Sequence, residues 1–375
     1  MAMIEASSIS GTAKAVLEFA KETSHGYSDL PQIDLSILTF DRGQGENYLT
    51  KTIKGIGTPL DVIFERQRFD TSVIPQMRAA VARRRVDVIW SNSVKSHFLV
   101  RLASLNRSSK WVAFHHGYTR PDTKMRIYNQ IDKWSLRKAD CVLTSSASFV
   151  GELTRKHIQP THIRVQHMPI RPFTQVSEIK KLELRRQLGF DERTPVLLCV
   201  GRLSQEKGHA NLIRAFPKMR ELAADARLRL VLVGEGPERS RLEELSRTLN
   251  LKDVVILVGQ QDEVAPYYSI ASVFVLPSLS EGCPNVLLEA MAADVPVVAT
   301  AVGGVSELAT DGRDAILVRK NDGAALASAA AEVLNNQQLR EHLVSCARGI
   351  VSQKSPEAYF RSMASILSQT YTNGN

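Results

Sequence analysis

The chain is 375 residues long, 43% hydrophobic and 23% charged, a composition that predicts about two globular domains and excludes a wholly disordered chain. No apolar run approaches a membrane span, no signal-peptide pattern opens the sequence, and four scattered cysteines argue against a disulfide framework or structural zinc, so we expect a cytoplasmic protein. The net charge of +9 suits nucleic acid, an anionic membrane surface or an anionic substrate.

The first half of the chain predicts an alternation of strands and helices. Short apolar runs typical of buried strands occupy residues 2–6, 34–40, 60–64, 86–90, 111–114 and 141–144. Helical patterns fall between them, for example at residues 12–21, 74–84, 96–105 and 124–137. Such an alternation favours a parallel sheet with helices on both faces.

The second half predicts the same alternation more regularly. Strands are expected at residues 196–200, 228–233, 254–258, 273–276, 295–299 and 316–318. Helices are expected at residues 212–222, 237–249, 263–271, 285–293, 323–334 and 338–351. This spacing predicts a second parallel sheet, again covered on both faces.

A boundary between the two halves is predicted near Pro169 and Pro172, where a polar stretch follows. We therefore expect an α/β protein with two Rossmann-like, doubly wound parallel-sheet domains facing across a cleft. The first would span residues 1–172 and the second residues 173–355. Because ligands of such sheets bind beyond the carboxyl ends of the strands, the strand-to-helix loops are the places to seek a site.

The strongest local signal is the segment 280–289, SEGCPNVLLE, which follows a predicted strand and opens a helix. Pro284 suits the first helical turn, whose free N–H groups attract an anion such as phosphate. Glu281 precedes the helix and Glu289 lies about two turns further on, so their carboxylates would flank that anion. A ligand with hydroxyl groups on both sides of a phosphate fits this spacing. A plain helix start with two solvated glutamates fits it equally well.

The second signal is the segment 200–208, VGRLSQEKG, at the first strand-to-helix turn of the second domain. Gly201 and Gly208 allow a flexible loop. Arg202 and Lys207 would neutralise a diphosphate if they faced the anion site. Taken alone, the segment also fits an ordinary surface turn with two basic residues.

Three further loops are weaker candidates. Residues 232–239, LVGEGPER, begin like a dinucleotide fingerprint, but Arg239 stands at the third glycine position, so we interpret them as a tight turn. His115 and His116, within FHHGY at residues 114–118, end a strand, where one can face the cleft while the other is buried. Gly11, within SISGTAK at residues 8–14, lets the backbone approach a phosphate, unless Ser10 simply caps the following helix.

Taken together, these motifs resemble those of the retaining glycosyltransferases of family 4, the large "group 1" family with the GT-B fold. Residues 200–208 resemble its G-R-L-x-x-x-K-G loop, residues 281–289 match its E-x7-E motif, and residues 303–307, GGVSE, resemble its G-G-x-x-E turn. The resemblance covers nearly the whole chain and is strongest over residues 195–320. It departs in the N-terminal loop, where Gly11 stands in place of paired glycines.

The resemblance implies a role for each matching residue. Arg202 and Lys207 would bind the donor diphosphate, Glu281 would contact the transferred sugar, and Glu289 would hold the ribose. His116 is the expected histidine near the anomeric carbon, with His115 as the alternative. The implied catalytic residues are His116, Glu281, Arg202 and Lys207, and the implied donor-binding residues are Gly11, Gly201, Arg202, Lys207, Glu281, Gly282, Cys283, Pro284, Asn285, Val286, Leu287 and Glu289.

The resemblance also implies how the domains divide the work. Residues 1–172 would bind the acceptor and residues 173–355 the donor, while a helix within residues 356–375 would cross back onto the first domain. Transfer would proceed with net retention by front-face attack, with the donor phosphate helping to deprotonate the acceptor hydroxyl. Domain closure would exclude water and so limit hydrolysis.

The predicted function is transfer of a sugar from a nucleotide diphosphate sugar, a UDP-sugar with a GDP-sugar as the alternative, to a glycan or a lipid-linked acceptor. No Asp-x-Asp pair occurs to hold a metal diphosphate, so neither a metal nor another cofactor is expected. The alternatives are a nucleotide-sugar epimerase of the same fold and a non-catalytic sugar-nucleotide-binding subunit. The presence of Arg202, Lys207 and Glu281 argues against the latter.

The surplus of positive charge lies wholly in the first half. Residues 1–175 hold 25 basic and 15 acidic side chains, whereas residues 176–375 hold 23 and 24. The basic residues are not interleaved with aromatic ones, so nucleic acid is not expected as a partner. Basic helices at residues 78–85 and 124–138 would instead suit an anionic membrane and a peripheral location on its inner face, with a solvated basic face as the alternative.

Overall fold

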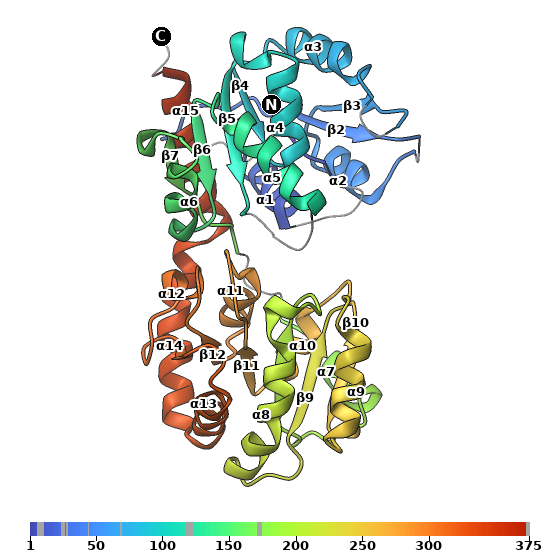
Figure 1. The fold of residues 1–375 in the computed structure, drawn as a ribbon, viewed down its shortest axis with the longest axis vertical. Helices are drawn as coiled ribbons and strands as arrows, with labels where there is room; N and C mark the ends of the chain where they lie inside the picture. The colour runs from blue at the N-terminus through green and yellow to red at the C-terminus, as the bar shows by residue number, and fades with distance from the viewer. Residues whose placement is uncertain are drawn as a thin grey trace. The chain divides into compact units, whose positions relative to one another are not determined.

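The computed structural model describes residues 1–5, 11–23, 27, 29–43, 45–67, 70–117, 123–170 and 175–372. The chain divides into two compact units, one of Met1–Pro169 with Ser355–Asn375 and one of Ile170–Lys354. Each unit is built on one parallel sheet with helices on both faces (Figure 1).

The first unit holds a seven-stranded sheet in the order β3-β2-β1-β4-β5-β6-β7, with every neighbouring pair parallel. Its strands are β1 (Ala2–Met3), β2 (Ile37–Asp41), β3 (Leu60–Phe64), β4 (Val88–Ser91), β5 (Lys110–His115), β6 (Cys141–Thr144) and β7 (Ile163–Val165). Its helices are α1 (Gly11–Thr23), α2 (Tyr48–Ile56), α3 (Val73–Arg83), α4 (Val94–Leu102), α5 (Thr123–Leu136), α6 (Val150–Thr154) and α15 (Pro356–Thr372), with 3-10 turns η1 (Leu105–Arg107), η2 (Ala147–Phe149) and η3 (Pro160–His162).

The second unit holds a six-stranded parallel sheet in the order β10-β9-β8-β11-β12-β13. Its strands are β8 (Val196–Val200), β9 (Arg229–Val233), β10 (Val255–Gly259), β11 (Val273–Leu276), β12 (Val297–Thr300) and β13 (Ile316–Val318). Its helices are α7 (Glu178–Gln187), α8 (His209–Leu222), α9 (Arg239–Thr248), α10 (Ala265–Ile270), α11 (Asn285–Ala292), α12 (Val305–Leu308), α13 (Gly323–Asn335) and α14 (Gln337–Gln353), with a 3-10 turn η4 (Gln205–Lys207).

Both faces of each sheet are buried, which explains why the strands read as continuous apolar runs. In β8, Leu198 packs into the core on one face, whereas Leu197 and Cys199 pack into the core on the other. In β5, Phe114 and Trp111 divide in the same way between two cores of the first unit. Because the strand period is two, consecutive residues at the end of such a strand point to opposite faces.

The C-terminal helix α15 belongs to the first unit. Tyr359, Phe360 and Met363 of α15 lie in the same core as α1. The Phe360 ring lies 4.9 Å from the Phe19 ring and 5.1 Å from the Tyr27 ring, measured between centroids. Each large apolar side chain buried in this way contributes about 1.5–3 kcal/mol, so α15 adds substantially to the core of this unit.

The regular elements occur where the apolar patterns predicted them, with shifts of one to three residues at most of the ends. The structure adds β7, α2, α6, α7 and α12, which the patterns did not single out. Helix α7 was missed because its sequence is dominated by charged residues, with Leu184 its buried residue. Helix α9 begins at Arg239, two residues later than predicted, after the turn that contains Pro237. No helix among the described residues is long and apolar enough to cross a bilayer.

Loops of the second unit touch backbone to backbone at glycines. Gly208, with φ +68°, is the N-cap of α8, and a Cβ atom there would collide with the carbonyl oxygen of Pro277 in the loop after β11. Gly303, with φ +50°, follows β12, and a Cβ atom there would collide with the carbonyl oxygen of Glu281. A side chain at either position would be strained and obstructed at once, so glycine is required where these loops meet.

We predict that Gly208→Ala lowers the melting temperature of the full chain much more than Gly312→Ala does. Both glycines have a left-handed φ, but a Cβ atom at Gly312 would meet nothing within 4 Å. Gly312→Ala therefore costs about 1–2 kcal/mol of backbone strain, whereas Gly208→Ala adds a collision with the Pro277 backbone. Thermal unfolding followed by circular dichroism measures both; equal losses would contradict the proposed contact.

Candidate active site

The loop after β8 carries Arg202 and Lys207 and is bound to the turn after β9. The Gly201 N–H donates to the carbonyl of the last residue of β9 (2.9 Å), and the Leu203 N–H donates to the Glu235 carbonyl (2.9 Å). The turn η4 then ends the loop, with Lys207 as its last residue. These bonds place Lys207 near the carboxyl end of β8, while the Arg202 side chain is exposed.

The loop after β11 lies against the loop after β8. The backbone carbonyl of Glu206 accepts hydrogen bonds from the N–H groups of Leu279 (2.8 Å) and Ser280 (3.4 Å). The Thr300 hydroxyl, at the end of β12, donates to the Ser278 carbonyl (2.5 Å). Strands β8 and β11 are neighbours at the place where the strand order reverses, which is where open α/β sheets bind ligands. The two strongest sequence segments therefore meet at this position.

Lys207 and Glu281 form a bidentate ion pair across these two loops. The Lys207 Nζ lies 2.7 Å from Glu281 Oε1 and 2.9 Å from Oε2, and the Ser278 hydroxyl donates to Oε1 (2.6 Å). The Glu281 side chain is 4% exposed and the Lys207 side chain 26% exposed. A buried carboxylate is tolerated when a cation and a hydrogen-bond donor compensate its lost hydration, and here Lys207 and Ser278 supply both.

Helix α11 begins directly after Glu281. Pro284 is its N-cap and Asn285 its first residue, so Pro284 lies one position before the helical turn to which the sequence assigned it. No side chain caps this helix, so its positive end is open to an anion. Of the other predicted donor-binding residues in this segment, Leu287 is buried, whereas Gly282, Cys283 and Val286 are half-buried.

Glu289 lies in the second turn of α11 and is held by Tyr268 of α10. The Tyr268 hydroxyl donates to Glu289 Oε2 (3.2 Å) and lies within 3.2 Å of the Val286 carbonyl. Burial raises the pKa of Tyr268, and the Glu289 carboxylate raises it further, so the phenol stays protonated and donates. Glu289 is thus an oriented carboxylate in a half-buried position.

Two weaker motifs have structural roles around these loops. The Gly304 N–H, in the segment GGVSE, donates to the Glu281 carbonyl (3.3 Å). Gly234, in the segment LVGEGPER, has φ +140°, and a Cβ atom there would collide with the Gly201 carbonyl oxygen. The prediction that residues 232–239 form a tight strand-to-helix turn is confirmed.

In the first unit, the two histidines at the end of β5 point to different surroundings. His115 is 3% exposed, and its Nδ1 lies 3.1 Å from the Asp132 carboxylate. His116 is exposed, and its ring stacks on the Phe114 ring at a centroid distance of 4.5 Å. His115 is therefore the structural histidine of the pair, and His116 is the one that a ligand can reach.

Helix α1 places Gly11 close to His116. Gly11 is the first residue of α1, and Thr12 follows it with its Oγ1 3.4 Å from His116 Nε2. The loop 6–10 that precedes them, with Ser10 as the suggested cap, lies outside the described residues. The predicted site residues thus form two groups, one in each unit: Gly11 with His116, and Lys207 with Arg202, Glu281 and the start of α11.

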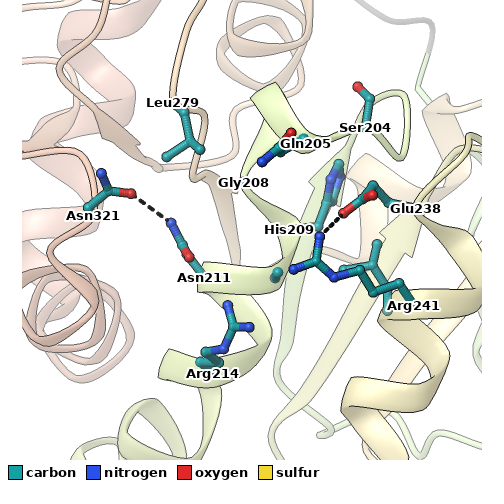
Figure 2. A pocket seen from close by; sticks show the side chains of 12 residues that line it. Ser204, Gln205, Gly208, His209, Asn211, Arg214, Glu238, Arg241, Leu279 and Asn321 are labelled. Carbon is teal, nitrogen blue, oxygen red and sulfur yellow. Dashed lines mark hydrogen bonds and ion pairs between the residues drawn. The ribbon is translucent and has the colours of Figure 1, made fainter.

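A separate hollow of about 130 Å³ lies beside the start of α8 in the second unit (Figure 2). Arg214 of α8 and Arg241 of α9 line it, and the His209 ring closes part of its wall with both ring nitrogens covered. Burial lowers the pKa of His209 to about 4, so the ring is neutral at pH 7. None of the predicted site residues lines this hollow.

Sequence reasoning missed four residues that hold the predicted ones in place. These are Ser278 on Glu281, Tyr268 on Glu289, Thr12 on His116 and Asp132 on His115. Ser278 had a signal, since it follows the buried strand β11 by two residues. Tyr268 and Asp132 had none, because each partner lies on another element 17 or more residues away. Among the described residues, no three His, Cys, Asp or Glu side chains gather as a metal site.

The sequence models of two protein families match most of the chain. The family described as "Glycosyl transferases group 1" matches residues 180–349, and the "Glycosyl transferase 4-like domain" matches residues 33–168. The first match includes the loop after β8 and the whole of α11, and the second includes β5 and its histidines.

Curated relatives include transferases and synthases of sugar compounds. The chain is 31% identical over 238 residues to alpha-D-kanosaminyltransferase of Streptomyces kanamyceticus, which covers 61% of each chain. It is 25% identical over 308 residues to N-acetyl-alpha-D-glucosaminyl L-malate synthase of Bacillus anthracis, covering 78% of this chain and 77% of the relative. The chain therefore matches less than two thirds of the first relative's length.

Solved structures share the fold along nearly the whole chain. Anabaena Alr3699/HepE, solved with UDP-glucose, has a TM-score of 0.80 and 19% identity over 98% of both chains. Sucrose-phosphate synthase of Thermosynechococcus elongatus has a TM-score of 0.78 and 22% identity over 99% of both chains. The two parallel sheets and these likenesses show the GT-B fold, and the two family matches show that the chain belongs to the group 1 family of glycosyltransferases.

Proposed function

We propose that this protein is a retaining glycosyltransferase that moves a sugar from a nucleotide diphosphate sugar to a glycan or a lipid-linked acceptor, without a metal. The observation that carries the proposal is the Lys207–Glu281 ion pair, which lies where the strand order of the second sheet reverses and directly before α11. Both residues belong to motifs of the family, and the pair joins them into one site.

The leaving group of such a donor is a nucleoside diphosphate, and the site has the charges to stabilise it. The Lys207 ammonium has three N–H donors, and two of its contacts are to the Glu281 carboxylate, so one donor remains for a phosphate oxygen. Arg202 is exposed, and no ion pair within the described residues occupies its guanidinium, which can take a second phosphate oxygen. The open N-terminus of α11 adds positive potential. Because its N–H groups are already oriented, little reorganisation is needed when charge develops on the leaving group.

The two carboxylates are binding groups in this proposal. Glu281 would accept hydrogen bonds from hydroxyls of the transferred sugar while Lys207 and Ser278 hold it in place. Glu289, oriented by Tyr268, would accept hydrogen bonds from the ribose hydroxyls. Bond cleavage then has oxocarbenium character, with the diphosphate leaving and helping to deprotonate the incoming acceptor hydroxyl on the same face.

His116 would act near the anomeric carbon from the first unit. It is exposed at the end of β5, and the neighbouring α1 N-terminus, with Gly11, offers backbone N–H groups to an anion. The ring of His116 is therefore available to a ligand, whereas His115 is held by Asp132.

A UDP-sugar is the donor that the comparisons favour, with a GDP-sugar as the alternative. Anabaena Alr3699/HepE has been solved with UDP and with UDP-glucose, and its fold matches nearly the whole of this chain. An epimerase of the same fold is less well supported. It needs acid and base carboxylates within reach of a sugar, and Asp132 is fully buried between two histidines.

A lipid-linked acceptor would be reached through the basic, partly apolar surface of α4 and α5. Ile127 is 60% exposed and Trp134 43% exposed, and the Arg101 guanidinium lies 3.4 Å above the Trp134 ring. Arg137 and Lys138 follow at the exposed end of α5. Apolar side chains beside cations suit the interface of an anionic membrane. On α3, by contrast, Arg83 and Arg84 are engaged by Asp61.

We expect UDP-sugars to raise the melting temperature of the protein more than GDP- or ADP-sugars do in a thermal-shift panel. A ligand at 100 times its Kd stabilises the folded state by about 2.7 kcal/mol. Arg202→Ala should reduce the UDP-sugar shift without lowering the melting temperature of the free protein, because Arg202 is exposed. Arg214→Ala, an exposed cation on α8, is the matched control. No shift with any nucleotide sugar would refute the proposed donor class.

We expect Lys207→Met and Glu281→Gln to lower transfer at least about a hundredfold, because the first removes a cation from the leaving diphosphate and the second removes the carboxylate that holds the transferred sugar. Lys207→Met should lower the melting temperature more than Glu281→Gln, because it leaves the 4% exposed carboxylate without its cation. Lys218→Met, which removes an exposed lysine paired with Glu221, should change neither. Normal turnover in either site variant would contradict the assigned roles.

For the membrane surface, we expect the protein to sediment with liposomes that contain phosphatidylglycerol and not with pure phosphatidylcholine. The binding should weaken as salt rises, because surface charges are screened over about 10 Å at 0.1 M salt. The double variant Ile127→Ser with Trp134→Ser should bind less, whereas Ile179→Ser, on exposed α7, should bind like the parent. The absence of salt-sensitive sedimentation with the anionic liposomes would contradict the membrane surface and favour a solvated basic face.

A further inference from the structure

A buried cluster of three titratable side chains lies under the end of β5. Asp132 of α5 is fully buried, His97 of α4 is 1% exposed and His115 of β5 is 3% exposed. The His97 Nδ1 lies 2.6 Å from Asp132 Oδ1, and the His115 Nδ1 lies 3.1 Å from Oδ2. One carboxylate thus joins two helices to the carboxyl end of a central strand.

The hydrogen-bond partners define the arrangement of this cluster. His97 contacts two acceptors, the Asp132 carboxylate through Nδ1 and the Ser91 carbonyl through Nε2 at 3.3 Å. Although burial opposes it, the electrostatic effect of His97 and the hydrogen bonds with both histidines hold the pKa of Asp132 below its ordinary value. Asp132 is therefore a buried carboxylate that is hydrogen-bonded to two buried histidines.

A buried polar cluster of this kind is weak evidence for stability, because well-packed apolar residues often do as well or better in its place. What this cluster does supply is a fixed orientation of the His115 ring. Both oxygens of Asp132 are engaged by ring nitrogens, so the carboxylate fixes the orientation of the His115 ring relative to α4 and α5.

The residues on both sides of His116 are held by packing. The His115 ring meets the Phe149 ring edge to face at 5.9 Å between centroids. Gly117 has φ +94°, and a Cβ atom there would collide with the same Phe149 ring. Because successive strand residues point to opposite faces, fixing His115 on the α4–α5 face fixes His116 on the opposite face, against Phe114 and Thr12.

We propose that Asp132 is a positioning residue for His116, acting through His115 and the end of β5, an inference that rests on the proposed function. It would set where the His116 ring stands without touching donor or acceptor. A displacement of about 1 Å at a reacting group can cost a hundredfold in rate. Loss of Asp132 should therefore slow turnover while leaving donor binding to the second unit unchanged.

The test compares Asp132→Asn, His116→Ala and their double variant. The reaction is hydrolysis of whichever of UDP-, GDP- or ADP-glucose stabilises the protein most, followed as release of the nucleoside diphosphate. Asp132→Asn should lower kcat about ten- to a hundredfold with the donor KM within about twofold, and the double variant should be no slower than His116→Ala. Histidine-ring NMR should show displaced His116 resonances and loss of the bonded His97 proton in Asp132→Asn.

Two further variants separate positioning from stability. Met77→Ala opens a cavity in the buried core of the same unit, on α3, which carries none of the three cluster residues, and it should lower the melting temperature while kcat stays unchanged. If Asp132→Asn does not fold, His115→Gln removes the link to β5 and keeps the Asp132–His97 hydrogen bond, and it should lower kcat with the same unchanged KM.

The outcomes distinguish this inference from the proposed function. Full activity of His116→Ala would refute the role assigned to His116 and, with it, the reason for positioning it. A slow His116→Ala variant beside a fully active Asp132→Asn variant with unmoved His116 resonances would overturn the positioning role alone. Additive losses in the double variant would show that Asp132 acts by a route that does not pass through His116.

Discussion

The second unit depends on one electrostatic constraint, the burial of the Glu281 carboxylate. A carboxylate that is 4% exposed needs a cation, and Lys207 is the residue that provides it, 74 positions earlier in the chain. Lys207 can do so because the Glu206 carbonyl already binds the N–H groups of Leu279 and Ser280. The ion pair and these backbone bonds reinforce one another, and together they fix a charged site on loops that would otherwise be variable.

The close approach of these loops also explains the glycines of the family motifs. Gly208 lies against the Pro277 backbone, and Gly303 lies against that of Glu281, so the loops after β8, β11 and β12 pack without side chains between them. Because glycine has no side chain at these contacts, the cation, the carboxylate and the α11 N-terminus lie in one small region. The positions are set by packed backbone, which costs little reorganisation when charge develops on a leaving group.

The first unit solves a related problem in a different way. Its candidate residue His116 is exposed at the end of β5, whereas its neighbour His115 is bonded to Asp132, which in turn is bonded to His97. A ligand can therefore reach His116, whereas His115 is buried and bonded to Asp132. The contrast also bears on function, since the buried carboxylate of Asp132 is unsuited to direct acid or base chemistry on a sugar.

The sequence by itself determined the α/β class, most of the strands and the motif loops, because buried parallel strands are apolar runs and the loop residues recur in a known spacing. Local pattern could not find β7, which is three residues long, or α7, which is mostly charged. Tertiary structure alone decided which histidine is exposed, that Lys207 contacts Glu281, and that Ser278, Tyr268, Thr12 and Asp132 hold the predicted residues. The physical reason is that side-chain direction and ion pairing between distant segments depend on strand register and loop packing, which no local pattern of residues records.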